Sequence, residues 1–131
     1  MKLNKKKKTI YLAGGFTSQW QLTAHKMLTG FILKDPSLHN IDDPIHYTQW
    51  DLDAIAHSDI LLANMESSNP GGYALALEVG YAKALGKEII LVDQIENDII
   101  KKYFEMVRQC SNHVFDNLDD ALFFILEQNS F

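Results

Sequence analysis

Short apolar runs that resemble buried strands alternate along this chain with stretches that have helical spacing. Thr9–Ala13, Asp59–Met65 and Glu88–Val92 are short, rich in β-branched or large aliphatic side chains, and apolar almost throughout. Strands that are apolar on both faces are typical of a parallel sheet with helices on each side. The alternation therefore predicts an α/β fold, a doubly wound parallel sheet of about five strands with helices on both faces.

The stretches between the runs predict the helices. They are expected from Thr17 or Ser18 to about Leu33, and over 50–57, 73–85, 97–110 and 118–126. Ser18 is expected to cap the first helix, and Gly86 to end the third. Val114 and Phe115 predict a short last strand. The polar segment 37–49 contains Pro44 and is assigned at most a short edge strand.

Length and charge restrict the class of protein. The 131 residues fit one domain, expected over 9–131 after a disordered basic tail over 1–8 that holds five lysines and no acid. The other seven basic residues stand against seventeen acidic ones, so a duplex nucleic-acid partner is not expected. The sequence shows no secretion signal and no run of eighteen apolar residues, so no membrane partner is expected. A single cysteine, Cys110, fits the reducing cytoplasm.

Several common site motifs are missing. The first turn, AGGFTS, lacks the spaced glycines of a dinucleotide site, and no serine lies in a G-x-S-x-G segment. The five histidines do not have metal-ligand spacing, so we expect neither a metal nor a cofactor. Parallel sheets bind ligands beyond the carboxyl ends of their strands. A site is therefore expected at the Gly14-Gly15 turn, the 65–72 loop and the segment after Val92.

Glu78 is the most unusual residue of the sequence. It belongs to the predicted helix GGYALALEVGYAKALGK, in which only Glu78 and Lys83 carry charge between Tyr73 and Leu85. Helical spacing places Glu78 on an apolar stripe with Ala74, Leu77, Tyr81, Ala82 and Leu85. A buried carboxylate is costly unless it is paired, protonated or beside a ligand. Glu78 is therefore a candidate catalytic residue, with a structural ion pair or partial exposure as the alternative.

Three further residues bear on this site. Tyr11 lies in the first strand, where a buried hydroxyl group needs a partner, and a carboxylate on a neighbouring helix is a natural one. Asp51 begins the predicted helix 50–57 and is either its N-cap or a site acid, whereas Asp53 is expected to face solvent. Asp59 opens a strand and is more typical of a turn or a cap.

Three segments together resemble the nucleoside 2-deoxyribosyltransferases: KKTIYLAGGFT, WDLDAIAHSDILLAN, and the glycine-rich loop followed by ALEVGYAKALGK. The resemblance runs from about Lys7 to Val92, is poor over 34–48, and extends more loosely to the 2'-deoxynucleoside 5'-phosphate N-hydrolases. It implies a flavodoxin-like, Rossmann-like sheet and a glutamate nucleophile at Glu78. It also implies that Tyr11 hydrogen-bonds this glutamate, and that Asp51 contacts or protonates the nucleobase.

The candidate substrate-binding residues, only some of which the resemblance implies, are Gly14, Gly15, Phe16, Trp50, Asn69, Gly71, Gly72, Asn112 and His113. Phe16 falls where an aromatic side chain lines the base pocket. Asn112 or His113 corresponds to a residue that a neighbouring subunit contributes, so a homo-oligomer with shared sites is expected. The small-molecule partners are a deoxynucleoside or deoxynucleotide and a free nucleobase.

Position 72 departs from the family pattern. The transferases carry an aspartate six residues before the nucleophile, where it holds the 5'-hydroxyl group of the sugar, and the hydrolases tend to carry a serine. Here Gly72 takes this place, so either Asn69 or a backbone group holds the sugar, or the N–H groups of Gly71 and Gly72 bind a 5'-phosphate. The first turn, AGGF, lacks the arginine of the hydrolases' phosphate turn.

Three functions are compatible with the sequence. The first is transfer of deoxyribose between nucleobases through a covalent ester of Glu78, with retention of configuration. The second is hydrolysis of the N-glycosidic bond of deoxynucleosides or their 5'-monophosphates. The third is a non-catalytic nucleotide-binding module with the same fold, which Glu78, Tyr11 and Asp51 argue against.

Overall fold

A five-stranded, wholly parallel sheet forms the centre of the molecule in the computed structural model, which describes residues 6–68 and 72–129. Its strands are β1 (Thr9–Gly14), β2 (Ile32–Lys34), β3 (Ile60–Met65), β4 (Glu88–Asp93) and β5 (His113–Phe115). They lie in the order β2-β1-β3-β4-β5, and the parallel sheet predicted from the sequence is confirmed. The strand order reverses between β1 and β3, and ligands bind at the carboxyl ends beside such a switch point.

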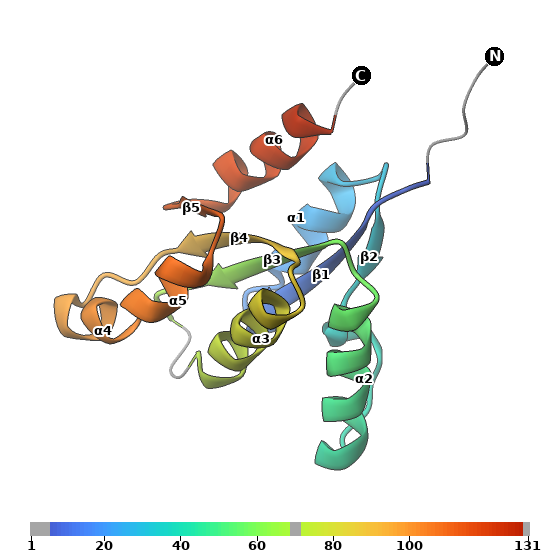
Figure 1. Cartoon of the computed structure of the whole chain (residues 1–131), viewed down its shortest axis with the longest axis horizontal. Helices are drawn as coiled ribbons and strands as arrows, with labels where there is room; N and C mark the ends of the chain where they lie inside the picture. The colour runs from blue at the N-terminus through green and yellow to red at the C-terminus, as the bar shows by residue number, and fades with distance from the viewer. Residues whose placement is uncertain (1–5, 69–71, 130–131) are drawn as a thin grey trace.

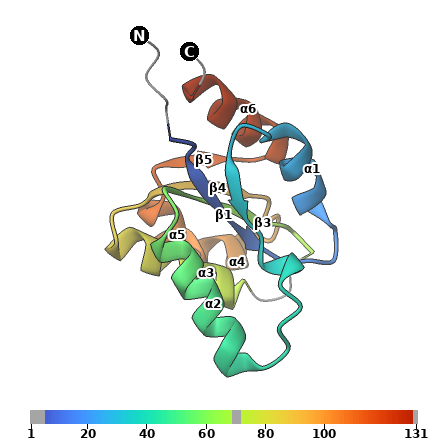
Figure 2. The same cartoon turned by 90° about the vertical axis from the view of Figure 1, so that its right-hand side faces the viewer.

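Helices cover both faces of this sheet (Figures 1 and 2). Helices α1 (Trp20–Met27) and α6 (Leu118–Gln128) lie on one face. Helices α2 (Pro44–Ala56), α3 (Tyr73–Ala84) and α5 (Glu105–Cys110) lie on the other, with α4 (Asp98–Tyr103) beside α5. A short 3-10 helix, η1 (Pro36–Leu38), leads from β2 towards α2. Within the described residues, no helix is both long and apolar enough to cross a membrane.

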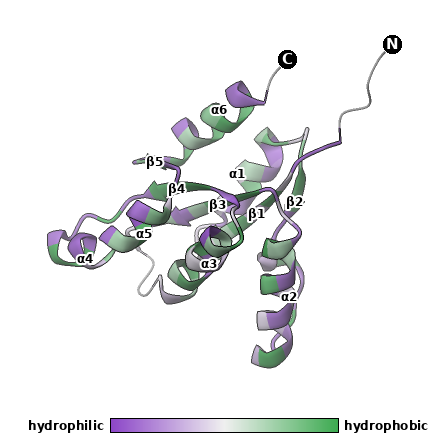
Figure 3. Ribbon diagram, viewed as in Figure 1, coloured by the Kyte–Doolittle hydropathy of each residue, from purple (hydrophilic) through white to green (hydrophobic). Residues whose placement is uncertain are grey.

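The side chains of the three central strands, β1, β3 and β4, alternate between two cores. Ile10 and Leu12 pack on the α1 and α6 side, whereas Tyr11 and Ala13 pack on the α2 and α3 side. Figure 3 shows the hydrophobic colour running along the central strands and the hydrophilic colour on outer parts of the helices. The sequence-based prediction of strands with two apolar faces is therefore confirmed, and it places the Tyr11 side chain on the same face as α3.

The first predicted helix is too long. It was expected to reach about Leu33, but α1 ends at Met27, and Ile32–Lys34 forms the edge strand β2 beside Thr9–Tyr11. Phe31 and Ile32 fit the helical spacing by coincidence, and Ile32 instead donates its N–H to the Lys8 carbonyl group. Ser18 is not the N-cap either, because Gln19 takes that position and the Ser18 hydroxyl group donates to Glu66 at 2.8 Å.

Two other predicted elements need correction. Helix α2 begins at Pro44, six residues before the predicted start, because the Asp43 side chain caps it by accepting the N–H of His46. The segment 37–49 therefore holds no edge strand but the end of η1 and the start of α2. The helix expected over 97–110 is divided at Phe104 into α4 and α5. Of the expected tail over 1–8, residues 1–5 lie outside the described residues, and residues 6–8 are exposed and irregular.

Candidate active site

Tyr11 and Glu78 form the centre of the candidate site. Tyr11 is fully buried in β1, Glu78 is 8% exposed in α3, and the Tyr11 hydroxyl group donates a hydrogen bond to Glu78 Oε2. Helix α3 carries Glu78 inward because its neighbours Leu75, Val79 and Ala82 pack against the sheet. The carboxyl group is thus held by one phenol in an otherwise apolar layer.

Burial dominates the protonation of this pair. It raises the pKa of Glu78 to about 7, although the hydrogen bond from Tyr11 opposes the rise and the negative charge of Asp51 adds to it. Burial also raises the pKa of Tyr11 far above its ordinary value, and the charge of Glu78 raises it further. Tyr11 therefore remains a hydrogen-bond donor across the pH range in which Glu78 gains and loses its proton.

Asp51 lies close enough to this pair to affect both pKa values. It is in the interior of α2 and is not the helix N-cap, which is Asp43. Burial raises the pKa of Asp51, and a hydrogen bond from His39 lowers it. The fold thus brings together Glu78, Tyr11 and Asp51, the three residues that the sequence predicts as catalytic, from α3, β1 and α2.

The turn after β1 supplies the next part of the site. Gly14 has φ +150°, and a Cβ atom there would lie 2.8 Å from the Asn64 backbone oxygen, so the glycine allows β1 and β3 to approach closely. The Gly15 carbonyl group accepts hydrogen bonds of 3.0 Å from the side chains of Trp20 and Gln21. This turn is therefore fixed to α1, and Phe16 follows it with 52% of its surface exposed.

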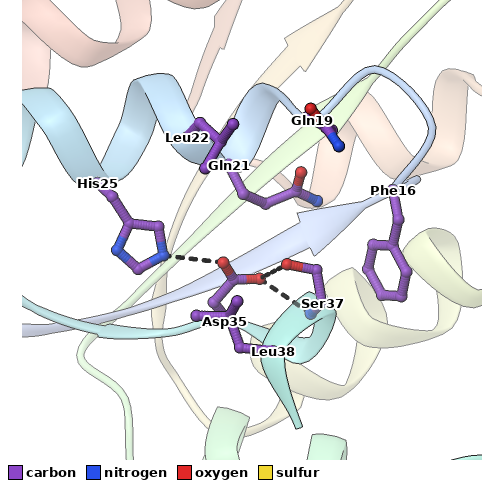
Figure 4. A pocket seen from close by; sticks show the side chains of 8 residues that line it. All are labelled: Phe16, Gln19, Gln21, Leu22, His25, Asp35, Ser37 and Leu38. Atoms are coloured by element: carbon purple, nitrogen blue, oxygen red, sulfur yellow. Dashed lines mark hydrogen bonds and ion pairs between the residues drawn. The ribbon is translucent and has the colours of Figure 1, made fainter. Parts of the chain in front are cut away.

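Phe16 lines a cavity of about 460 Å³ between α1 and η1, shown in Figure 4. The other lining residues are Gln19, Gln21, Leu22, His25, Asp35, Ser37 and Leu38. Asp35 is buried at its floor, where it accepts hydrogen bonds from the Ser37 N–H and hydroxyl groups and pairs with His25 Nε2 at 2.8 Å. Tyr11, Asp51 and Glu78 do not line this cavity, so the expectation that Phe16 contacts a nucleobase stays a prediction.

Sequence reasoning missed the residues around this cavity. The signal for Asp35 lies in the Asp-Pro-Ser segment, which is typical of an Asx turn that starts a short helix. His25 and His39 carried no signal, because their partners Asp35 and Asp51 lie ten and twelve residues away on other elements. Asn64 was missed as well. It is 1% exposed at the carboxyl end of β3, and its Oδ1 atom has no hydrogen-bond partner within the described residues.

Several predicted residues lie outside this cluster. Trp50 is next to Asp51, packs edge-on against His39 with ring centroids 4.7 Å apart, and lines a smaller cavity of about 240 Å³ with Asp53. Asp53 is exposed, as predicted. Asp59 accepts the backbone N–H of Thr9 at 2.8 Å and so ties β1 to the start of β3.

Asn112 and His113 lie at the start of β5, with β3 and β4 between them and Tyr11. The Asn112 side chain accepts the N–H of Ile89 at 2.8 Å, and the His113 ring packs on Phe124 of α6, on the opposite face from Glu78. Neither residue reaches Glu78 of its own chain. Their predicted role in the site of a neighbouring subunit stays a prediction.

The glycine-rich loop is described only in part. Asn69 and Gly71, both predicted to bind substrate, lie outside the described residues. Gly72 is the N-cap of α3 with φ +60°, and no side chain caps the helix there. In the part of the chain that the structure describes, no side chain caps the N-terminal N–H groups of α3. Among residues 6–68 and 72–129, no group of histidine, cysteine and acidic side chains could hold a metal ion.

Residues 7–95 match the family model described as nucleoside 2-deoxyribosyltransferase like. The chain belongs to the nucleoside 2-deoxyribosyltransferase-like family. The match spans β1 to β4 and includes Tyr11, Asp51 and Glu78, so the resemblance drawn from the three sequence segments is confirmed.

Solved structures of similar proteins agree with this family. A 2-deoxyribosyltransferase of Leishmania mexicana superimposes with a TM-score of 0.75 at 21% identity, over 94% of this chain and 99% of that one. The 2-deoxyribosyltransferase of Bacillus psychrosaccharolyticus superimposes with a TM-score of 0.71 at 21% identity, over 87% of this chain and 90% of that one. A CMP N-glycosidase of Clostridium botulinum superimposes with a TM-score of 0.61 at 23% identity, over 90% of this chain and 98% of that one. These matches establish the shared fold. No curated protein sequence is significantly similar to this chain.

Proposed function

We propose that this family member is a nucleoside 2-deoxyribosyltransferase, which moves 2-deoxyribose from one nucleobase to another through an ester of Glu78. The observation that carries the proposal is the buried Glu78 carboxyl group, held by Tyr11 and close to a second acid, Asp51. Family membership and the similarity to two deoxyribosyltransferases support it.

The first half of the reaction breaks the bond between the base and the sugar. A Glu78 carboxylate oxygen attacks the anomeric carbon, the electron pair of the N-glycosidic bond leaves with the base, and Asp51 gives the base a proton. The transition state resembles an oxocarbenium ion, so a fixed negative charge beside it lowers the barrier. Tyr11 holds Oε2 by its hydrogen bond, which fixes the carboxylate for attack.

The second half of the reaction restores the enzyme. An acceptor base attacks the anomeric carbon of the ester, the bond to Glu78 breaks, and the proton of the acceptor returns to Asp51. Each half inverts the anomeric configuration, so the whole transfer retains it. This cycle requires Glu78 ionised and Asp51 protonated at its start. Burial raises the pKa of both acids, and the charge of Asp51 raises that of Glu78 further, so a proton on Asp51 favours the ionised state of Glu78.

Hydrolysis of a deoxynucleoside or its 5'-monophosphate is the second candidate. Gly72 favours it, because this residue stands where the transferases carry an acid, and a glycine N-cap has no side chain of its own to accept from the N–H groups of α3. Backbone N–H groups at a helix N-terminus suit a phosphate. The similarity to the CMP N-glycosidase is consistent with this alternative.

One experiment separates these functions. The protein is incubated with 2'-deoxyinosine, with and without adenine, and with the 5'-monophosphate in parallel, and the products are resolved by chromatography. Deoxyadenosine formed only when adenine is present supports the transferase. Free deoxyribose or its phosphate without an acceptor indicates the hydrolase instead. Binding of substrate without any product indicates a non-catalytic module.

Two variants make this experiment specific to the site. Glu78→Ala is expected to abolish product formation, and Glu96→Ala, which changes an exposed loop glutamate, keeps the wild-type rate. A Glu78→Ala variant with near wild-type turnover overturns the proposed nucleophile. We also propose a homo-oligomer in which Asn112 or His113 completes the site of another copy. Light scattering of the active protein tests this part, and an active monomer contradicts it.

A further inference from the structure

His39 lies on the segment between η1 and α2 and contacts Asp51 directly. Its Nε2 atom is 3.2 Å from Asp51 Oδ1, and its ring packs edge-on against Trp50. The side chain of His39 is 12% exposed and that of Asp51 is 21% exposed, so water screens this pair only in part. His39 therefore contacts the proposed proton donor from a segment outside α2, the helix that carries Asp51.

A second hydrogen bond fixes the tautomer of His39. The backbone N–H of Ile41 donates to His39 Nδ1 at 3.0 Å, so Nδ1 is an acceptor and carries no proton. A neutral imidazole with a bare Nδ1 has its proton on Nε2, and that proton points at Asp51 Oδ1.

Asp51 is acted on from three elements. His39 precedes α2 and donates to Oδ1, Glu78 on α3 is a negative charge, and Tyr11 on β1 is a neutral phenol already committed to Glu78. The second oxygen, Oδ2, has no hydrogen-bond partner among residues 6–68 and 72–129. A carboxyl group held at one oxygen by a fixed donor presents the other oxygen, and any proton on it, in one direction.

We infer that His39 is a positioning residue for Asp51: its Nε2–H group holds Oδ1 and leaves Oδ2 as the oxygen that exchanges a proton with the nucleobase. The inference rests on the proposed function. In each half of the reaction the proton moves between Asp51 Oδ2 and a base nitrogen, while His39 keeps its own proton. His39 itself touches neither the sugar nor the breaking bond.

Three variants test the inference. His39→Ala removes the donor, and His39→Gln replaces it, because a glutamine amide nitrogen can reach the place of Nε2. His46→Ala is the matched control, since His46 also pairs with an aspartate of the α2 region, Asp43, but is exposed. The carboxyl titration of Asp51 is followed by carbon NMR in each protein, and kcat is measured against pH with good and poor leaving bases.

The two measurements have separate outcomes. In His39→Ala the Asp51 titration is expected to move to higher pH, because the carboxylate loses a hydrogen bond. Turnover of poor leaving bases should fall about tenfold, and His39→Gln should recover most of both. An unchanged titration in His39→Ala, or a loss that His39→Gln does not recover, overturns the inference. A wild-type protein without turnover on any deoxynucleoside refutes the proposed function, whereas the titration still reports on the His39–Asp51 pair.

Discussion

The Tyr11 hydroxyl group donates to the Glu78 carboxylate between residues 67 positions apart in the sequence. The bond connects β1 to α3 across the sheet face that α2 also covers. It is the one hydrogen bond that the described structure gives to the Glu78 side chain. The protonation state of Glu78 therefore depends on two opposed effects: the Tyr11 hydrogen bond lowers its pKa, and burial raises it.

Removing the Tyr11 hydroxyl group should lower kcat/KM most at low pH. In Tyr11→Phe the pKa of Glu78 rises above its value of about 7, because the hydrogen bond that lowers it is lost. A hydrogen bond to a charged group contributes about 1.5–3 kcal/mol, so kcat/KM should fall about tenfold to a hundredfold at pH 7. The loss should be greater at pH 6 than at pH 9. Equal losses at both pH values would show that Tyr11 acts through packing and not through its hydrogen bond to Glu78. Tyr103→Phe is the control, because Tyr103 is exposed.

Neutralising Glu78 should stabilise the fold at high pH. The folded-state pKa of about 7 lies above the ordinary value of 4.5, so the folded state binds the proton more tightly than the unfolded chain. The stabilisation that this proton provides is complete below pH 4.5 and is lost as the pH rises through 7. The loss amounts to about 3 kcal/mol, since each pH unit between the two values contributes 1.36 kcal/mol.

Glu78→Gln isolates this effect, because its amide is neutral at every pH. The free energy of unfolding of the variant should exceed that of the wild type by about 3 kcal/mol at pH 8 and match it near pH 4. Urea unfolding at both pH values measures the difference. A variant that is less stable than the wild type at pH 8 would show that ionised Glu78 supports the fold. If Glu78→Gln is more stable but inactive, Glu78 serves catalysis at a cost in stability.

Much of the fold follows from the sequence because the central strands are apolar on both faces. Ile60–Met65 and Glu88–Asp93 are buried almost throughout, so no alternation of polar residues obscures them. The edge strand β2 is assigned wrongly because it has no such buried apolar run. Its three residues pair on one side only, with β1, and their spacing continues that of α1, so local pattern favoured one long helix over a turn at Thr29-Gly30.

The site could be predicted where a residue conflicts with its surroundings. Glu78 was identified because a charge stands on an apolar helix, and Tyr11 because a hydroxyl group stands in an apolar strand. His39 could not be found in this way. It lies in a polar segment, and its importance arises only when the chain places its ring between Ile41 and Asp51. When two polar residues from polar segments contact each other, neither is unusual in its own segment, so the sequence gives no sign of the contact.

Asp51 can be tested through the leaving group. If Asp51 gives the departing base its proton, Asp51→Asn should slow poor leaving bases much more than activated ones, because an activated base departs without protonation. General acid catalysis typically contributes about 10²–10⁴ in rate, so the loss on a poor leaving base should fall in that range. Rates are compared for a series of deoxynucleosides whose bases differ in acidity. Equal losses across the series would demote Asp51 to substrate positioning.

Gly14 should be sensitive to a single methyl group. Its φ of +150° is rarely adopted by other residues, and an added Cβ atom would meet the Asn64 backbone oxygen at 2.8 Å and Trp20 Nε1 at 3.1 Å. The oxygen belongs to the neighbouring strand β3 and cannot move aside without opening the sheet. Gly14→Ala should therefore lower the free energy of unfolding by about 1–3 kcal/mol.

Gly30→Ala is the matched control for this prediction, because a Cβ atom at Gly30 meets nothing within 4 Å. That variant should keep the wild-type stability or gain slightly, since alanine restricts the unfolded chain more than glycine does. Chemical unfolding of both variants measures the difference between them. If Gly14→Ala unfolds at the same denaturant concentration as Gly30→Ala, the close approach of β1 and β3 is not what requires a glycine. The turn that carries Phe16 would then owe its position to the hydrogen bonds that Trp20 and Gln21 donate to Gly15.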